Sequence, residues 1–299
     1  MKIALSHIIS NIPSRPSKEE ISEKLFQLGH EHEVEGDIFN IEFTPNRGDC
    51  LSINGILRDL SVFYKVNLNS SIYTKKINNM DLKFDNFEKE ACPNISFLKI
   101  EVHEKKSEYK DYLSNYFKHL EAKKNNFFTD ISNYVSYETG QPTHCYDAAK
   151  VEGNLSLNVI DGTYHFETLL DKKIELKGKN LVFFCKDKII NLAGIIGGKN
   201  TSCSEKTVSV IAECAYFNAE AIIGKSLKYD INSDAAYKFE RNTDPECHEM
   251  VLRRFLKIIS KHAKIKNVEL CTHNYVKYER IFIPFDTDII NKINGIEIS

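Results

Sequence analysis

The sequence predicts an α+β fold in which a small N-terminal α/β domain precedes a larger, β-rich α+β domain. The prediction rests on a capped helix and an alternating strand near the N-terminus, on short apolar runs beyond Val151, and on helical patterning that returns late in the chain. Strand-rich and helix-rich runs that do not alternate regularly favour α+β over α/β architecture. A chain of 299 residues is long enough for two domains.

Residues 1–72 form the predicted N-terminal domain. Ser17 precedes acidic residues and then apolar residues at helical spacing, which predicts a capped helix over 17–30. Polar and apolar side chains alternate over 37–44 and predict a half-buried strand. Apolar positions on one face predict a second helix over 51–66, ahead of a linker rich in Asn and Ser.

Residues 73–277 form the predicted second domain. It is expected to begin with a strand over 95–102 and a charged helix over 107–122. Short apolar runs between turn residues predict further strands at 155–160, 173–176, 181–185, 189–192 and 208–212. The other predicted elements are helices over 218–227 and 245–263, strands over 268–271 and 280–284, and the start of an incomplete further domain over 278–299.

Charge and hydropathy exclude several classes of protein. Forty Lys and Arg residues against forty-two Asp and Glu residues give a net charge of −2, so no global positive field draws the chain to polyanions. No apolar stretch approaches the roughly 20 residues of a bilayer span, and the first residues turn polar too soon for a signal peptide. We therefore expect a cytoplasmic chain that does not cross a membrane and does not bind nucleic acid strongly by itself.

Cysteine spacing argues against a metal centre. The eight cysteines include no Cys-x-x-Cys pair and no short Cys/His cluster, so neither a zinc site nor a disulfide framework is expected. Most of them adjoin apolar residues, which is typical of free thiols buried in a reducing compartment. No bound metal is predicted.

Polar segments that interrupt apolar runs are the candidate site loops. The first covers residues 44–52, where Asp49 is placed to cap the next helix and Arg47 to pair with Asp59 or a neighbouring carboxylate. By itself this segment is a strand-to-helix turn.

The second polar segment, residues 133–147, is dense in hydrogen-bonding groups around a Gly-Gln-Pro turn. His144 suits acid–base chemistry or substrate positioning. From the residues alone, a core histidine bonded to Asp147 or to a backbone carbonyl is the favoured interpretation.

Two further segments carry weaker signals. Gly197 and Gly198 end an apolar strand, where they either admit a ligand close to the backbone or form an ordinary hairpin turn. Glu213 lies inside an apolar strand, where it either reads a ligand or faces solvent from an edge strand.

Taken in order, these segments resemble the beta-subunit family of bacterial phenylalanyl-tRNA synthetases. Five collinear motifs carry the resemblance: Asn46-Arg47-Gly48-Asp49-Cys50-Leu51-Ser52 with Gly55 and Arg58, Asp130 to Asp147, Ala193-Gly194-Ile195-Ile196-Gly197-Gly198, Glu213-x-Ala215-x-Phe217, and Ser233-x-Ala235-x-x-Lys238-Phe239-Glu240-Arg241-x-x-Asp244-Pro245. The departures are Gly48 for the family's usual Pro, Thr143 for an apolar residue, Tyr146 for Phe and Ile196 for Met.

The resemblance implies a division of labour along the chain. Residues 1–72 resemble the family's N-terminal domain, and residues 73–277 resemble its tRNA-editing domain, which hydrolyses tyrosine mischarged on phenylalanine tRNA. Between Glu35 and Ile41 the chain lacks the tRNA-binding oligonucleotide-binding-fold insertion that the family commonly carries. Independent capture of tRNA is therefore not expected.

The resemblance also implies partners and cofactors. The expected partners are the synthetase alpha subunit and phenylalanine tRNA with its mischarged tyrosyl form. ATP and magnesium would serve the ligase reaction of the whole enzyme, and this chain is expected to bind no cofactor itself. Because aminoacylation belongs to the alpha subunit in this family, the chain alone is not expected to aminoacylate.

Site residues follow from the same motifs. Glu213 would accept a hydrogen bond from the tyrosine phenol, and with phenylalanine bound it would stay unpaired at a cost of roughly 1–3 kcal/mol. Catalytic roles in positioning water or the terminal ribose are expected for Asn133, Thr143 and His144. Substrate contacts are expected, besides Glu213, at Gly197, Gly198 and Ala235.

An alternative from another class is a non-catalytic structural or interaction subunit, or an inactive remnant that keeps the fold. A free-standing binder of an amino acid is a third possibility. An active site of this type requires a pocket that joins His144 to Glu213, whereas in an inactive chain Tyr146 or another side chain can fill that pocket.

Overall fold

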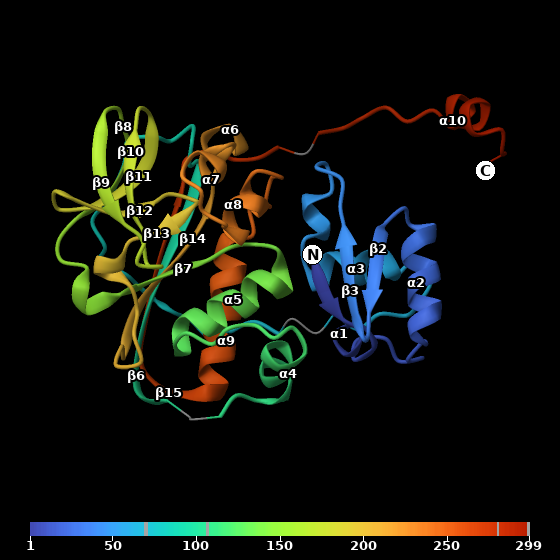
Figure 1. The fold of residues 1–299 in the computed structure, drawn as a ribbon, viewed down its shortest axis with the longest axis horizontal. Coiled ribbons are helices and arrows are strands. Elements are labelled where there is room, and N and C mark those ends of the chain that lie inside the picture. Colours follow the sequence, from blue (N-terminus) through green and yellow to red (C-terminus); the bar gives the residue numbers. More distant parts are fainter. Residues whose placement is uncertain (69–70, 106–107, 280, 298–299) are drawn as a thin grey trace.

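The computed structural model describes residues 1–68, 71–105, 108–279 and 281–297. Figure 1 shows an N-terminal body (residues 1–66), a large body (residues 71–279) and a C-terminal tail (residues 281–297) that ends away from both bodies. This is the α+β fold that the sequence predicts. Among the described residues, no helix is both long enough and apolar enough to cross a bilayer.

The N-terminal body is a three-stranded antiparallel sheet covered by helices. The sheet order is β1-β3-β2. Its strands and helices are β1 (Lys2–Ala4), β2 (Glu31–Glu35), β3 (Ile38–Glu42), α1 (Leu5–Ile9), α2 (Lys18–Gln27), the 3₁₀ turn η1 (Gly48–Cys50) and α3 (Ile53–Leu60).

Helix α2 and strand β3 form where short-range sequence patterns predict them. Helix α2 begins at a capping box, because Ser17 Oγ accepts from the amide of Glu20 at 3.2 Å while the Glu20 carboxylate accepts from the amide of Ser17 at 2.7 Å. Strand β3 buries Phe39 and Ile41 and leaves the intervening Asn40 half-buried, as its alternation predicts. Strand β2 was not predicted, because its sequence Glu-His-Glu-Val-Glu lacks an apolar face.

The predicted cap of α3 is wrong. Ser52 caps this helix by accepting from the amide of Gly55 at 2.9 Å. The Asp49 carboxylate instead pairs with Arg47 and Arg58. Helix α3 is also shorter than predicted, because the chain enters turns after Leu60.

Two five-stranded sheets and a hairpin form the framework of the large body. The first sheet runs β4 (Asn78–Asn79), β15 (Ala263–Asn274), β6 (Asn94–Lys105), β14 (Ser209–Tyr216), β7 (His144–Asp147). The second runs β13 (Ile196–Gly197), β12 (Lys188–Leu192), β11 (Asn180–Cys185), β8 (Leu155–Ile160), β5 (Phe84–Asn86), and β9 (Thr163–Glu167) pairs with β10 (Lys173–Lys177).

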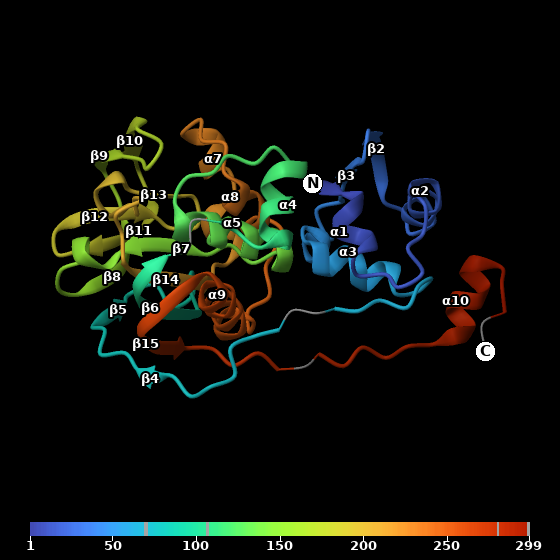
Figure 2. The same cartoon turned by 90° about the horizontal axis from the view of Figure 1, so that it is seen from below.

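The helices of the large body are α4 (Asp111–His119), α5 (Phe127–Thr139), α6 (Ala219–Ile222), α7 (Lys225–Lys228), α8 (Asp234–Phe239) and α9 (His248–His262), with 3₁₀ turns η2 (Ala148–Lys150) and η3 (Lys199–Thr201). Three of them, α4, α5 and α9, lie on one side of the first sheet, whereas α6 and α8 contribute to the core between the two sheets. Figure 2 shows α9 against β6, β14 and β15. Helix α10 (Thr287–Asn294) belongs to the tail and contributes no buried residue.

Strand β14 divides two hydrophobic cores. Its Val210, Ala212 and Cys214 belong to the core on the side of α5 and α9, which also includes the N-terminal body. Its Ile211 and Ala215 belong to the core between the two sheets. Side chains alternate along a strand. Glu213 therefore points between the sheets.

Several predicted elements of the large body need correction. Residues 133–139, predicted as part of a polar turn, form the second half of α5. The helix expected over 218–227 breaks into α6 and α7 at Gly224, whose φ of +77° ends α-helical geometry. No strand forms over 281–284, and Arg280 lies outside the described residues.

Candidate functional site

The two strands β7 and β14 bring together chemical groups that are far apart in sequence. Their antiparallel register sets Glu213 opposite His144 and Ile211 opposite Tyr146. Because side chains two residues apart share a face of the sheet, His144 and Tyr146 lie on the side of Glu213. Strand β14 lies between β6 and β7, and Glu213 is 4% exposed, so the edge-strand, solvent-facing interpretation is wrong.

A buried polar network joins the two sheets at this point. The Tyr146 hydroxyl donates to Glu213 Oε2 at 2.6 Å. The same hydroxyl accepts from Asn191 Nδ2 of β12 at 2.8 Å. Tyr146 has no exposed surface and Asn191 is 4% exposed. The phenol thus uses both its donor and an acceptor position within the protein.

Burial controls the ionisation of this network. Desolvation raises the pKa of Glu213 to about 7, and the hydrogen bond from Tyr146 offsets part of that rise. Desolvation and the nearby Glu213 raise the pKa of Tyr146 well above its usual value. The phenol is therefore protonated at neutral pH and remains the hydrogen-bond donor.

His144 presents an unused nitrogen beside the network. Its Nε2 is buried and has no hydrogen-bond partner among the described residues. Desolvation lowers the pKa of the imidazole to about 4, so the ring is neutral at pH 7. The ring packs edge-on against Tyr146 with centroids 4.4 Å apart. Asp147 bonds instead to the Thr207 hydroxyl and the amide of Ala149, so it does not fix this histidine.

The His144 imidazole lies directly against the backbone of Gly197. A Cβ added at Gly197 would lie 2.1 Å from Cε1 of His144. We expect Gly197→Ala to displace the ring and to lower the free energy of unfolding by about 1–3 kcal/mol. NMR signals of the His144 ring and chemical denaturation measure the two effects. Gly178→Ala, where a Cβ meets open space but φ is +65°, is the control for the His144 signal alone, because its left-handed backbone itself makes alanine unfavourable. An unshifted His144 signal in Gly197→Ala would contradict the expected displacement.

Three cavities adjoin at Thr143, which lines all of them. The smallest has a volume of about 60 Å³, and each of the other two has about 570 Å³. Cavities that hold a whole small molecule usually measure about 300–1,000 Å³. The small cavity therefore accepts only the end of a ligand, whose remainder has room in a larger one.

Most of the predicted site residues meet at these cavities. The small cavity is lined by Thr143, His144, Gly197, Glu213 and Ala235, among others. Asn133 is exposed and lines the two larger cavities rather than the small one. Gly198 lines none of the three, and its amide already donates to the carbonyl of Ile190 at 2.7 Å.

Three polar residues of the site received no functional role from the sequence. Asn191 interrupts an apolar strand, which is the same signal that singled out Glu213. Ser132 lies on α5, donates to the carbonyl of Thr143 at 2.8 Å and bonds to its hydroxyl at 2.7 Å. Lys238 of α8 is buried and donates to the Ser136 carbonyl at 2.8 Å and hydroxyl at 2.9 Å.

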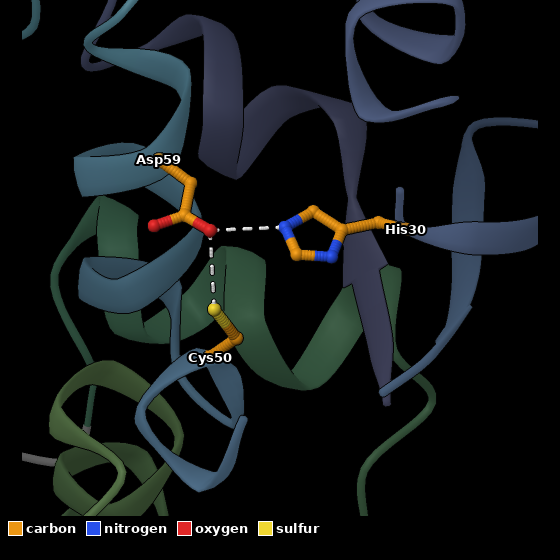
Figure 3. A group of neighbouring side chains, drawn as sticks. All are labelled: His30, Cys50 and Asp59. Atoms are coloured by element: carbon orange, nitrogen blue, oxygen red, sulfur yellow. Dashed lines mark hydrogen bonds and ion pairs between the residues drawn. The ribbon is translucent and has the colours of Figure 1, made fainter. Parts of the chain in front are cut away.

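A separate cluster in the N-terminal body resembles a metal site in composition. Figure 3 shows His30, Cys50 and Asp59, whose ligand-type atoms lie within 4.8 Å of one another. The His30 Nε2 to Asp59 Oδ2 distance is 3.0 Å. Arg47 donates to Asp59 at 2.5 Å, as the sequence predicts, and to Cys50 Sγ at 2.7 Å.

The charges of this cluster favour an ion-pair network over a bound cation. Arg58 also reaches Asp59, at 3.2 Å, so two guanidinium groups occupy the carboxylate that a cation would need. Burial and the nearby carboxylates raise the pKa of Cys50 to about 12, which keeps it a thiol rather than the thiolate that metals bind. The described cysteines are all free thiols.

Comparison with known proteins places the chain in a family. The family model described as "B3/4 domain" matches residues 91–264, which include both strands of the site. The chain is 30% identical to the phenylalanine--tRNA ligase beta subunit of Rickettsia bellii (strain RML369-C), over 89% of this chain and 34% of that protein. It is 32% identical to the protein of the same name from Fusobacterium nucleatum, over 86% of this chain and 33% of that protein.

A solved structure is also similar to the chain. It is an N-terminal fragment of the phenylalanyl-tRNA synthetase beta subunit from Pyrococcus horikoshii, with a TM-score of 0.45 and 12% identity. The alignment covers 100% of this chain and 85% of the fragment. The chain spans about a third of the length of the curated relatives it matches. The profile match and these identities show that the chain belongs to the B3/4 domain family and is homologous to the beta subunit of phenylalanine--tRNA ligase.

Proposed function

We propose that this chain carries the editing site of a phenylalanine--tRNA ligase beta subunit and hydrolyses tyrosine mischarged on phenylalanine tRNA. The observation that carries the proposal is the small cavity, which brings an unpartnered imidazole and a buried carboxylate together with Thr143, Gly197 and Ala235.

The proposed reaction needs only water. Water adds to the ester carbonyl, the bond from that carbon to the ribose oxygen breaks, and the ribose oxygen takes up a proton; free amino acid and tRNA result. The neutral His144 offers Nε2 as an acceptor for the attacking water or a ribose hydroxyl. ATP and magnesium would serve only the separate ligase reaction, which the whole enzyme with its alpha subunit would carry out.

The larger cavities supply room for the remainder of the substrate. Thr143 lines all three cavities, so a ligand whose side chain ends near Glu213 can place its ester close to Thr143 and His144. Asn133 and Lys123 line both larger cavities. An exposed lysine there suits the phosphates at the end of an RNA strand.

The test is deacylation of mischarged tyrosyl-tRNA by the purified chain, alone and with an alpha subunit. We expect His144→Ala to lower the rate by at least about 100-fold, because a positioned acid–base group contributes about that much. His165→Ala, at an exposed histidine of β9, is the matched control and should keep the full rate. A rate no greater than spontaneous hydrolysis in every arm would contradict the proposal.

A second candidate is a non-catalytic subunit that keeps the fold. One observation favours it: the Glu213 carboxylate already accepts a hydrogen bond from Tyr146 at 2.6 Å, within the protein. In that case the same assay gives equal, uncatalysed rates for the wild-type chain and both histidine variants.

A further inference from the structure

Glu213, the carboxylate proposed to read a substrate phenol, already holds a phenol of the protein itself. The Tyr146 hydroxyl lies 2.6 Å from Glu213 Oε2, and both side chains are buried. A tyrosine substrate would offer the same chemical group to the same carboxylate.

The internal phenol is held firmly in place. Asn191 donates to its oxygen at 2.8 Å from the opposite sheet. The ring packs against the His144 imidazole, and no part of Tyr146 is exposed. Tyr146 therefore keeps its position without any ligand. It does not itself line the small cavity and acts on a ligand there through Glu213, which does.

We propose that Tyr146 is a specificity-determining residue of this pocket, because its hydroxyl occupies the Glu213 oxygen that would otherwise recognise the hydroxyl of a tyrosyl substrate. The inference rests on the proposed function and defines its substrate class more closely. In the wild-type chain Glu213 distinguishes tyrosine only weakly from an amino acid of the same shape that lacks the hydroxyl.

The decisive variant is Tyr146→Phe, which keeps the ring and removes only the hydroxyl. L-tyrosinamide and L-phenylalaninamide are the probes, and isothermal titration calorimetry measures their binding to the full chain. We expect the variant to bind L-tyrosinamide about 10- to 100-fold more tightly than wild type, the range for pairing a buried acceptor that is otherwise left unsatisfied. Binding of L-phenylalaninamide should change less than about threefold.

Tyr109→Phe is the matched control. It removes a hydroxyl that donates to Asp130 Oδ2 at 2.7 Å, and Tyr109 lines none of the three cavities. Affinity for both probes should be unchanged. A gain shared by both Tyr→Phe variants would reflect loosening of the fold and would contradict the proposal.

A second measurement needs no variant. Wild type should bind the two probes with affinities within about threefold of each other, because the Tyr146 hydroxyl already occupies Glu213 Oε2 and a substrate phenol would have to displace it or share the carboxylate with it. A preference of wild type for L-tyrosinamide of tenfold or more would overturn the proposal. So would an unchanged ratio of the two affinities in Tyr146→Phe, including no detectable binding by either protein.

Deacylation separates this proposal from the proposed function. If both proteins hydrolyse tyrosyl-tRNA no faster than the spontaneous reaction while Tyr146→Phe gains affinity for L-tyrosinamide, the editing function fails and the role of Tyr146 stands. If wild type edits and the variant shows no gain in the ratio of tyrosyl to phenylalanyl hydrolysis, the role of Tyr146 fails and editing stands.

Discussion

Replacing Arg254 with methionine is expected to lower the free energy of unfolding by about 3–5 kcal/mol, because it leaves the buried Glu138 carboxylate without its cationic partner. Arg254 of α9 bonds to both oxygens of Glu138, at 2.5 and 2.6 Å. The two side chains are only 7% and 9% exposed. Arg254 also donates to the carbonyl of Ser71 at 2.9 Å, in the segment that enters the large body.

A double-mutant cycle tests this interpretation. Glu138→Gln combined with Arg254→Met should recover part of the loss, because no unpaired charge then remains. Arg253→Met is the matched control, since its pair with Glu249 is more exposed and should cost about 1 kcal/mol or less. Urea denaturation measures each variant. A cost for Arg254→Met no larger than for Arg253→Met would show that the buried pair does not matter for stability.

As the pH rises, the free energy of unfolding of the wild-type chain is expected to fall by about 3 kcal/mol because of Glu213, and Glu213→Gln should remove this fall. Burial raises the pKa of Glu213 from 4.5 to about 7. The folded chain therefore retains this proton over a pH range in which the unfolded chain loses it. Stability from this group is complete below pH 4.5 and is lost as the pH rises through about 7. His144, with a pKa lowered to about 4, acts in the opposite direction: its stability is complete above pH 6.5 and is lost as the pH falls through about 4.

Denaturation between pH 4 and pH 8 measures the effect. The difference in stability between wild type and Glu213→Gln should change by about 3 kcal/mol across this range, in favour of the variant at high pH. Glu33→Gln, at an exposed position of β2, should give a constant difference instead. Parallel curves for wild type and Glu213→Gln would mean that Glu213 ionises in the folded chain as it does in water.

Short-range signals in the sequence were sufficient for some elements. Helix α2 follows from Ser17 and Glu20, and strand β3 follows from alternation around Phe39 and Ile41, because each signal depends on neighbours within a few residues. Glu213 stood out because a carboxylate inside an apolar strand needs an explanation.

The contacts that define the site could not be predicted in this way. Tyr146 and Glu213 are 67 residues apart, and Asn191 comes from a different sheet. Their meeting depends on the β7–β14 register and on the packing of the two sheets, which no local pattern encodes. Residues 133–139 were missed as helix because the density of polar groups around the Gly-Gln-Pro turn hid the apolar face of α5.

Helix α5 of the large body contacts the N-terminal body and also lines the larger cavities. One of its sides packs against α3 of the N-terminal body, and its Ser132 and Asn133 line the larger cavities. Met1, Lys2 and Leu51 of the N-terminal body complete the lining of one of these cavities. Residues of both bodies therefore line this cavity beside Thr143, and its shape depends on how the two bodies pack. A substrate bound in this cavity would contact both bodies and would therefore stabilise their packing against each other.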